Sequence, residues 1–119
     1  MLFKRQRLDN RAYPRVDFFQ PSFFIVENDA VPAASDCWFN NISLGGLSLE
    51  SDRERLDDTE ISVLYRIGRQ MRKDRLRVRF SKKLMTKWRY GCQFMLPDDQ
   101  RSTLIEEYVT KKIDEGAVG

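Results

Sequence analysis

Short runs in which hydrophobic residues alternate with polar ones fill most of the chain, and this period of two predicts β-strands. In residues 75–80 three arginines alternate with Leu76, Val78 and Phe80, which we expect to point inward. Similar patterns, or runs of β-branched and aromatic residues, predict further strands at 16–26, 37–43, 45–51, 61–67 and 87–96. Pro21 lies inside the first run, so we expect a bulge or an edge position there.

Turn-forming residues separate these runs and a helix follows them. Their composition predicts loops or turns at 27–36, 51–60 and 68–74. After the turn signal Pro-Asp-Asp, hydrophobic residues recur at helical spacing from Leu104 to Ile113, with Ser102 as the expected N-cap. Six antiparallel strands and one closing helix predict a mainly β fold, a six-stranded antiparallel β-barrel with a C-terminal helix.

The size of the chain, 119 residues with 41% hydrophobic and 33% charged residues, fits one folded domain. We expect a basic N-terminal arm over residues 1–15, and the barrel with its helix over residues 16–113. No apolar run approaches the ~18 residues that span a bilayer, and no secretory signal is recognisable. We therefore expect a cytoplasmic protein without a membrane segment.

The residue types limit the chemistry of the chain. It has two cysteines, Cys37 and Cys92, and no histidine. In a cytoplasmic protein these are expected as buried thiols rather than as a disulfide. Without histidine or a Cys-x-x-Cys pair, a zinc site and a Ser-His-Asp or Cys-His catalytic group lack their usual residues. We expect no metal site, no cofactor and no enzymatic activity.

Positive charge is concentrated in two segments, although the net charge is only +3. Residues 1–15 contain five Lys and Arg residues, and residues 66–89 contain eleven against the single acid Asp74. A surface built from both segments would attract an anion. Composition alone favours ordinary solvated strand faces.

The first motif of interest is Arg11-Ala12-Tyr13-Pro14-Arg15, two arginines four positions apart directly before the first strand. Pro14 restricts Tyr13 to an extended conformation, so the pair does not lie on a helix. In a bent segment both guanidinium groups could converge on one ligand. Arginine forms paired, charge-assisted hydrogen bonds with phosphate and with guanine O6 and N7.

The second motif is Asn41-x-Ser43-x-x-Gly46, which begins thirty residues after Arg11. Asn41 and Ser43 alternate along a strand, so both side chains point to the same face. An amide and a hydroxyl beside a glycine turn suit a base edge or a phosphate, and Gly46 would let a ligand approach the main chain. A plain β-turn with polar strand residues would give the same pattern.

The two motifs in this order resemble those of the PilZ family of bacterial cyclic-di-GMP receptors. The sequence Arg-Tyr-Gly-Cys-Gln-Phe-Met at 89–95 is similar to the closing strand of that family, and the helix near Ser102 has the expected place. The resemblance implies a receptor for cyclic-di-GMP that signals to an unidentified downstream protein. It further implies that Arg11, Arg15, Asn41 and Ser43 bind the ligand, that Gly46 allows its approach, and that Arg7 is a possible additional contact.

Two other functions are compatible with the residues. A basic barrel could bind single-stranded nucleic acid if bases stack on Trp38 and Trp88 and the arginines of residues 75–79 contact phosphates. We interpret these tryptophans instead as core or rim aromatics, and the arginines as one exposed strand face. A PilZ-type domain without a ligand could act as a protein–protein adaptor. The paired motifs favour the receptor, and we expect nucleic acid not to be a partner.

Overall fold

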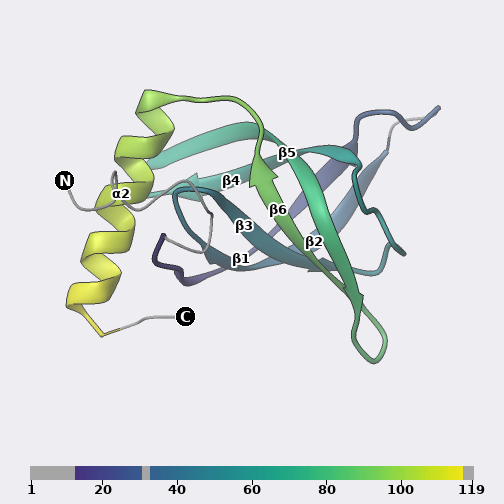
Figure 1. The fold of residues 1–119 in the computed structure, drawn as a ribbon, viewed down its shortest axis with the longest axis horizontal. Coiled ribbons are helices and arrows are strands. Elements are labelled where there is room, and N and C mark those ends of the chain that lie inside the picture. Colours follow the sequence, from purple (N-terminus) through teal and green to yellow (C-terminus); the bar gives the residue numbers. More distant parts are fainter. Residues whose placement is uncertain (1–12, 31–32, 117–119) are drawn as a thin grey trace.

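The computed structural model describes residues 13–30 and 33–116 of the chain (Figure 1). The elements are β1 (Val16–Val26), β2 (Ala34–Ile42), β3 (Gly46–Ser51), β4 (Glu60–Ile67), β5 (Gln70–Lys83), β6 (Trp88–Phe94) and the helix α2 (Asp99–Asp114). Each strand contains the alternating or β-branched residues that predicted it. None of the described helical residues forms a segment long and apolar enough to cross a membrane.

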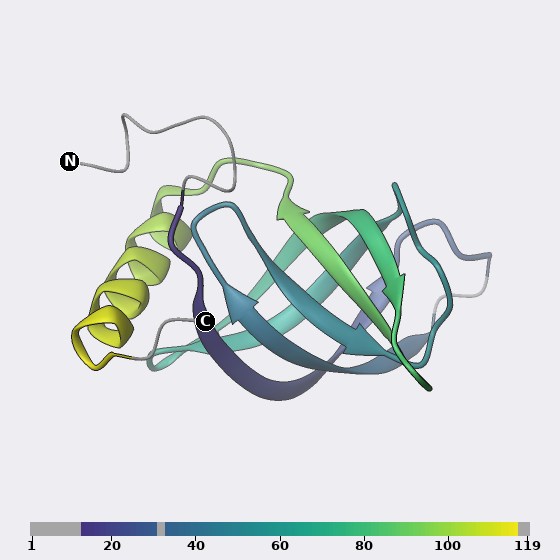
Figure 2. The same cartoon turned by 60° about the horizontal axis from the view of Figure 1, so that its bottom comes forward.

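The strands close into a barrel in the order β1-β2-β3-β6-β5-β4, and every neighbouring pair is antiparallel. The helix α2 covers one end of this barrel, and the β5–β6 hairpin extends from the other (Figures 1 and 2). Closure gives every strand a hydrogen-bonding neighbour on both sides. The predicted six-stranded barrel with a C-terminal helix is therefore confirmed.

Hydrophobic side chains that point inward from the strands fill the barrel. Phe18 lies near the α2 end, where its ring stacks on Phe39 at 5.9 Å between centroids and meets Tyr65 edge-on at 6.0 Å. Tyr108 of α2 packs edge-on against the same Phe18 ring at 5.3 Å, and its hydroxyl donates to the Asp17 carbonyl over 3.1 Å. Aromatic contacts of this kind supplement the burial of apolar area, so they help to hold α2 on the barrel.

Strand β1 confirms the prediction made from Pro21. Its register against β2 shifts between Asp17 and Gln20, and it pairs with β4 only from Phe24 to Val26. Pro21 therefore lies where the ladder with β4 has opened, and its missing N–H costs no hydrogen bond there. The side-chain amide of Gln20 takes the place of the main chain, because it bonds both the N–H and the carbonyl of Arg66.

The turn predicted at 68–74 is wrong. The turn contains only Gly68 and Arg69, and β5 begins at Gln70, which pairs with Ile67. Gly68 has a φ of 61°, the left-handed conformation that two-residue hairpin turns require. The hydrophobic pattern missed the first residues of β5 because Asp74, a charged residue, occupies a buried position on the inner face where the pattern requires an apolar residue.

The inward position predicted for Phe80 is also wrong. The register between β5 and β6 shifts from Val78–Cys92 to Phe80–Gly91, so β5 holds one extra residue at Arg79. Such a bulge reverses the faces of the residues that follow it. Leu76 and Val78 point inward as predicted, whereas the side chain of Phe80 is 51% exposed.

The N-cap of α2 is Asp98 and not the predicted Ser102. Its carboxylate accepts a hydrogen bond from the Arg101 N–H at 2.9 Å, and the helix begins at Asp99. Asp is as good an N-cap as Ser, and a negative charge at this position also favours the helix dipole. This backbone hydrogen bond, followed by one from Arg72, holds the pKa of Asp98 below its ordinary value.

A buried polar cluster joins α2 to strands β4 and β5. The carboxylate of Asp74 accepts hydrogen bonds from Arg72 at 3.0 Å, from Arg101 at 3.3 Å and from the Tyr65 hydroxyl at 2.5 Å. Arg72 also donates to Asp98 at 2.8 Å. Burial opposes ionisation of Asp74, but the hydrogen bonds from Arg72 and Tyr65 outweigh it and lower its pKa. The cluster thus fixes the start of α2 through a charged carboxylate.

Candidate functional site

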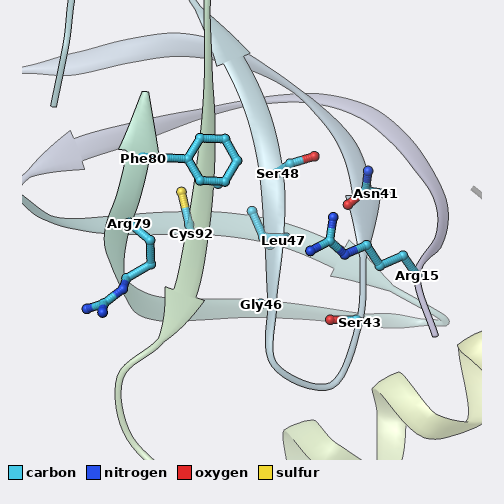
Figure 3. Close-up of a pocket in the computed structure, with 10 residues that line it drawn as sticks. Arg15, Asn41, Ser43, Gly46, Leu47, Ser48, Arg79, Phe80 and Cys92 are labelled. Atoms are coloured by element: carbon cyan, nitrogen blue, oxygen red, sulfur yellow. The ribbon is translucent and has the colours of Figure 1, made fainter. Parts of the chain in front are cut away.

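A shallow pocket of about 100 Å³ lies on the outer face of the barrel and contains much of the predicted site (Figure 3). It spans the end of β2, strand β3, the bulged part of β5 and strand β6. The residues that line it are Arg15, Asn41, Ser43, Gly46, Leu47, Ser48, Arg79, Phe80, Gly91 and Cys92.

The β2–β3 turn places Asn41 and Ser43 in this pocket. The register of β2 against β3 shifts between Phe39 and Asn41, while Ile42 stays in the core. The Ser43 N–H then bonds the Gly46 carbonyl at 2.8 Å, and the Ser43 hydroxyl accepts from the Gly45 N–H at 3.2 Å. The hydroxyl of Ser43 therefore has a structural role in the turn, and the side chain of Asn41 is left without a hydrogen bond to the described residues.

Gly46 is required by the neighbouring strand. A Cβ placed on it would lie 1.9 Å from the carbonyl oxygen of Cys92, because β3 and β6 approach each other closely there. No side chain fits against a fixed main-chain carbonyl at that distance. The sequence suggested that some group approaches the main chain at Gly46, and in the structure strand β6 makes this approach.

Two arginines bring positive charge to opposite sides of the pocket. Arg15 precedes β1 and reaches over β2 and β3, and Arg79 extends from the β5 bulge (Figure 3). Both are exposed, and neither has a hydrogen bond or an ion pair with residues 13–30 or 33–116. Their charge therefore stays available to an anion that enters the pocket.

An aromatic ring forms another wall. The ring of Phe80 lies over Gly91 of β6, where a Cβ would come within 2.2 Å of it. The absence of a side chain at Gly91 thus allows the ring to lie against the strand with about half of its surface exposed. Cys92 lies below, where burial raises the pKa of its thiol and keeps it protonated.

The structure brings together four of the residues predicted from the two motifs: Arg15, Asn41, Ser43 and Gly46. Arg11 and Arg7 lie outside the described residues. The sequence reading missed Ser48, Arg79 and Phe80. Arg79 and Phe80 were assigned to a regular strand, and a one-residue bulge carries no clear sequence signal unless a glycine marks it. Ser48 is one of several polar residues in an alternating strand and has nothing that distinguishes it.

The other features considered for nucleic-acid binding are occupied or dispersed. Arg75 lies 3.6 Å from Glu27, and Arg77 lies 3.1 Å from Glu60, so two of the three alternating arginines form ion pairs. Trp88 is half-buried with Arg55 over its ring at 5.7 Å. Trp38 is exposed on β2 beside Pro21 of β1, away from the residues of the pocket.

A second and larger cavity of about 480 Å³ lies between β1, the β4–β5 turn and α2. Its walls include Phe19, Arg66, Leu104 and Lys111. Arg15, Asn41, Ser43 and Gly46, the predicted ligand-binding residues within the described part of the chain, do not line it.

Comparison with known proteins identifies one family from the sequence and from the fold. The family model described as PilZ domain matches residues 9–111. The fold is similar to the PilZ domain of YcgR from Escherichia coli with c-di-GMP, with a TM-score of 0.68, 12% identity and 94% of each chain covered. No curated protein matches the sequence.

Two further solved structures share the fold. The inhibitor of motility MotI/DgrA of Bacillus subtilis aligns with a TM-score of 0.65 and 14% identity over 92% of this chain and 54% of that one. The PilZ domain of CeSA from a cellulose-synthesizing bacterium aligns with a TM-score of 0.56 and 9% identity over 82% of this chain and 95% of the other. Because the family model covers most of its length and the fold agrees, this chain belongs to the PilZ domain family.

Proposed function

We propose that this protein is a cytoplasmic, non-enzymatic receptor for cyclic-di-GMP. The observation that supports this most directly is the convergence of Arg15, Asn41 and Ser43 on one pocket. These residues come from two motifs that are far apart in the sequence. Within the described chain, the side chains of Arg15 and Asn41 have no structural hydrogen bond that would explain them.

The chemistry of the pocket suits a ligand with two guanines and two phosphates. Arg15 and Arg79 supply guanidinium groups that pair with phosphate oxygens or with guanine O6 and N7. The amide of Asn41 offers both a donor and an acceptor to a base edge. The exposed face of Phe80 offers a surface on which a purine stacks.

The pocket is a shelf that contacts only one side of such a ligand. Its volume of about 100 Å³ is well below the roughly 300–1,000 Å³ of enclosed ligand sites. We infer that the remaining contacts come from the basic arm, because the arm continues directly from Arg15 at the edge of the pocket. We therefore assign Arg11, with Arg7 as an additional contact, to the opposite side of the ligand.

Closure of the arm over the ligand would also transmit the signal. The dianionic ligand neutralises arginines that otherwise repel one another, so the arm gains a stable position against β2 and β3 only when ligand is present. A downstream protein would recognise the combined surface of arm, ligand and barrel.

Calorimetric titration of the purified protein with cyclic-di-GMP tests this function. GTP and a short single-stranded DNA serve as controls. The expected result is saturable heat with cyclic-di-GMP alone. The dissociation constant should be micromolar or lower, which corresponds to a favourable binding free energy of about 8–10 kcal/mol. No heat with cyclic-di-GMP would contradict the proposal and would favour an adaptor, and a salt-dependent response to DNA would favour a nucleic-acid-binding barrel.

A further inference from the structure

The hydroxyl of Ser48 is buried and has no hydrogen-bond partner among the described residues. Only two other buried side-chain atoms there are in the same situation, Asn40 Oδ1 and Arg101 Nε. Two of the three thus flank Asn41, since Asn40 precedes it in β2 and Ser48 pairs with it from β3. Unsatisfied buried polar groups destabilise a fold, so the unpaired hydroxyl of Ser48, which belongs to a residue of the pocket lining, requires an explanation.

Other serines of the barrel show how this hydroxyl group is normally satisfied. Ser51, three positions further along the same strand and 3% exposed, accepts a hydrogen bond from the Arg53 N–H at 3.2 Å. Ser81 accepts one from the Leu56 N–H at 3.0 Å, and Ser22 donates to the Leu64 carbonyl. Ser48 has no such structural role, so the folded state alone gives no reason for a polar side chain there.

The position of Ser48 indicates what the hydroxyl serves. It lies on the outer face of β3, with Asn41 of β2 on one side and Gly91 of β6 on the other. It lines the pocket between the Arg15 side and the Arg79 side (Figure 3). A serine side chain exchanges between three staggered positions about χ1, so a ligand on the shelf can recruit the hydroxyl by a single rotation.

We propose that Ser48 is a further ligand-binding residue, whose hydroxyl donates to a phosphate or guanine oxygen of cyclic-di-GMP at the centre of the shelf. This inference rests on the receptor function proposed above. It gives the unpaired hydroxyl a partner that arrives with the ligand. It also places a contact between the Asn41 side and the Phe80 side of the pocket, which the two sequence motifs do not connect.

Two serine substitutions in the same strand test the proposal. Ser48→Ala removes an unsatisfied group, so the melting temperature of the free protein should stay the same or rise, while the affinity for cyclic-di-GMP should fall at least about fivefold. Ser51→Ala is the matched control. It removes a satisfied buried hydroxyl away from the pocket, so it should lower the melting temperature and leave the affinity unchanged.

The outcomes separate the two proposals. If wild-type protein binds cyclic-di-GMP and Ser48→Ala binds equally well, the role of Ser48 is refuted and the receptor function stands. If Ser48→Ala loses stability together with affinity, as a structural hydroxyl would, the role is also refuted. If wild-type protein gives no heat with cyclic-di-GMP, the receptor function fails, and the role of Ser48 fails with it.

Discussion

The ring of Phe80 occupies the space that a side chain at Gly91 would need, with 2.2 Å between Phe80 Cε2 and a Cβ built on Gly91. The two residues face each other across β5 and β6, directly after the β5 bulge. The bulge turns Phe80 outward, and Gly91 lets the ring lie flat enough to form a wall of the pocket. The shape of the shelf therefore depends on a contact between two residues that belong neither to the Arg11–Arg15 motif nor to the Asn41–Gly46 motif.

We predict that Phe80→Ala weakens cyclic-di-GMP binding by about fivefold or more, because a stacked base contributes roughly 1–3 kcal/mol. Gly91→Ala should weaken binding as well, since its methyl group displaces the ring from the shelf. Calorimetry measures both affinities. Phe23→Ala removes an exposed phenylalanine of β1 that is outside the pocket and should leave the affinity unchanged. Equal affinities of wild type and Phe80→Ala would show that no base stacks on this ring.

A second prediction concerns Gly46, where a side chain would collide with main-chain atoms of the neighbouring strand. An added Cβ would meet the Cys92 carbonyl oxygen at 1.9 Å, and β3 and β6 cannot separate without breaking their ladder. Gly46→Ala should therefore reduce the free energy of unfolding by at least about 2 kcal/mol. Urea denaturation without ligand measures this loss. Gly91→Ala is the comparison, and it should cost less because the exposed Phe80 ring can move. A fully stable Gly46→Ala protein would contradict the requirement for glycine there.

Sequence patterns were sufficient to predict the barrel. Alternation in β4 and β5, together with the aromatic and β-branched residues of β1, identified the strands. In a barrel strand every second side chain points inward, and these inward side chains are mostly apolar. The same rule failed at the start of β5, where Asp74 points inward and is stabilised by Tyr65 of β4 and by Arg101 of α2, together with Arg72 of its own strand. Tertiary partners of this kind leave no local signal.

The candidate site was predicted only in part for a related reason. Arg15, Asn41, Ser43 and Gly46 belong to local motifs, so their spacing revealed them before the structure placed them together. Arg79 and Phe80 reach the pocket because a bulge shifts the register by one residue, and register shifts depend on pairing between distant strands. Ser48 is distinguished only by the absence of a partner, which is a property of the folded structure.

A third prediction tests the arginine that the structure places in the pocket. Arg15→Ala should weaken cyclic-di-GMP binding at least tenfold, or about 1.4 kcal/mol, because it removes charge-assisted hydrogen bonds to the ligand. Arg11→Ala, at the other position of the motif, should have an effect of similar size. Calorimetry under one fixed salt concentration measures both affinities.

Arg66→Ala is the control for general electrostatics. Arg66 is exposed, its side chain makes no ion pair within the described chain, and it lines the cavity beside α2 instead of the shelf. Its loss changes the net charge by the same amount as the loss of Arg15. We expect it to alter affinity by less than about twofold, since exposed charges at a distance are screened by salt. An equal effect of both substitutions would mean that Arg15 acts only through the overall charge.

The fourth prediction concerns the buried cluster that fixes α2. Asp74→Asn should lower the free energy of unfolding at neutral pH by about 3 kcal/mol, because it leaves the buried guanidinium of Arg101 without its counter-charge. Urea denaturation measures this change. Asp57→Asn breaks the exposed Arg55–Asp57 ion pair and is the matched control, for which no measurable loss is expected.

The pH dependence of this difference identifies the charge on Asp74 as its cause. Its pKa is lower in the folded state than the ordinary value of about 3.9, so its stabilising effect is fully present above about pH 4. The effect is lost as the pH falls through the lowered folded-state pKa, where the native carboxylate also becomes protonated. The stabilities of wild type and Asp74→Asn should therefore differ most at neutral pH and converge as the pH falls below about 4. A difference that stays constant over this range would show that Asp74 stabilises α2 through packing and not through its charge.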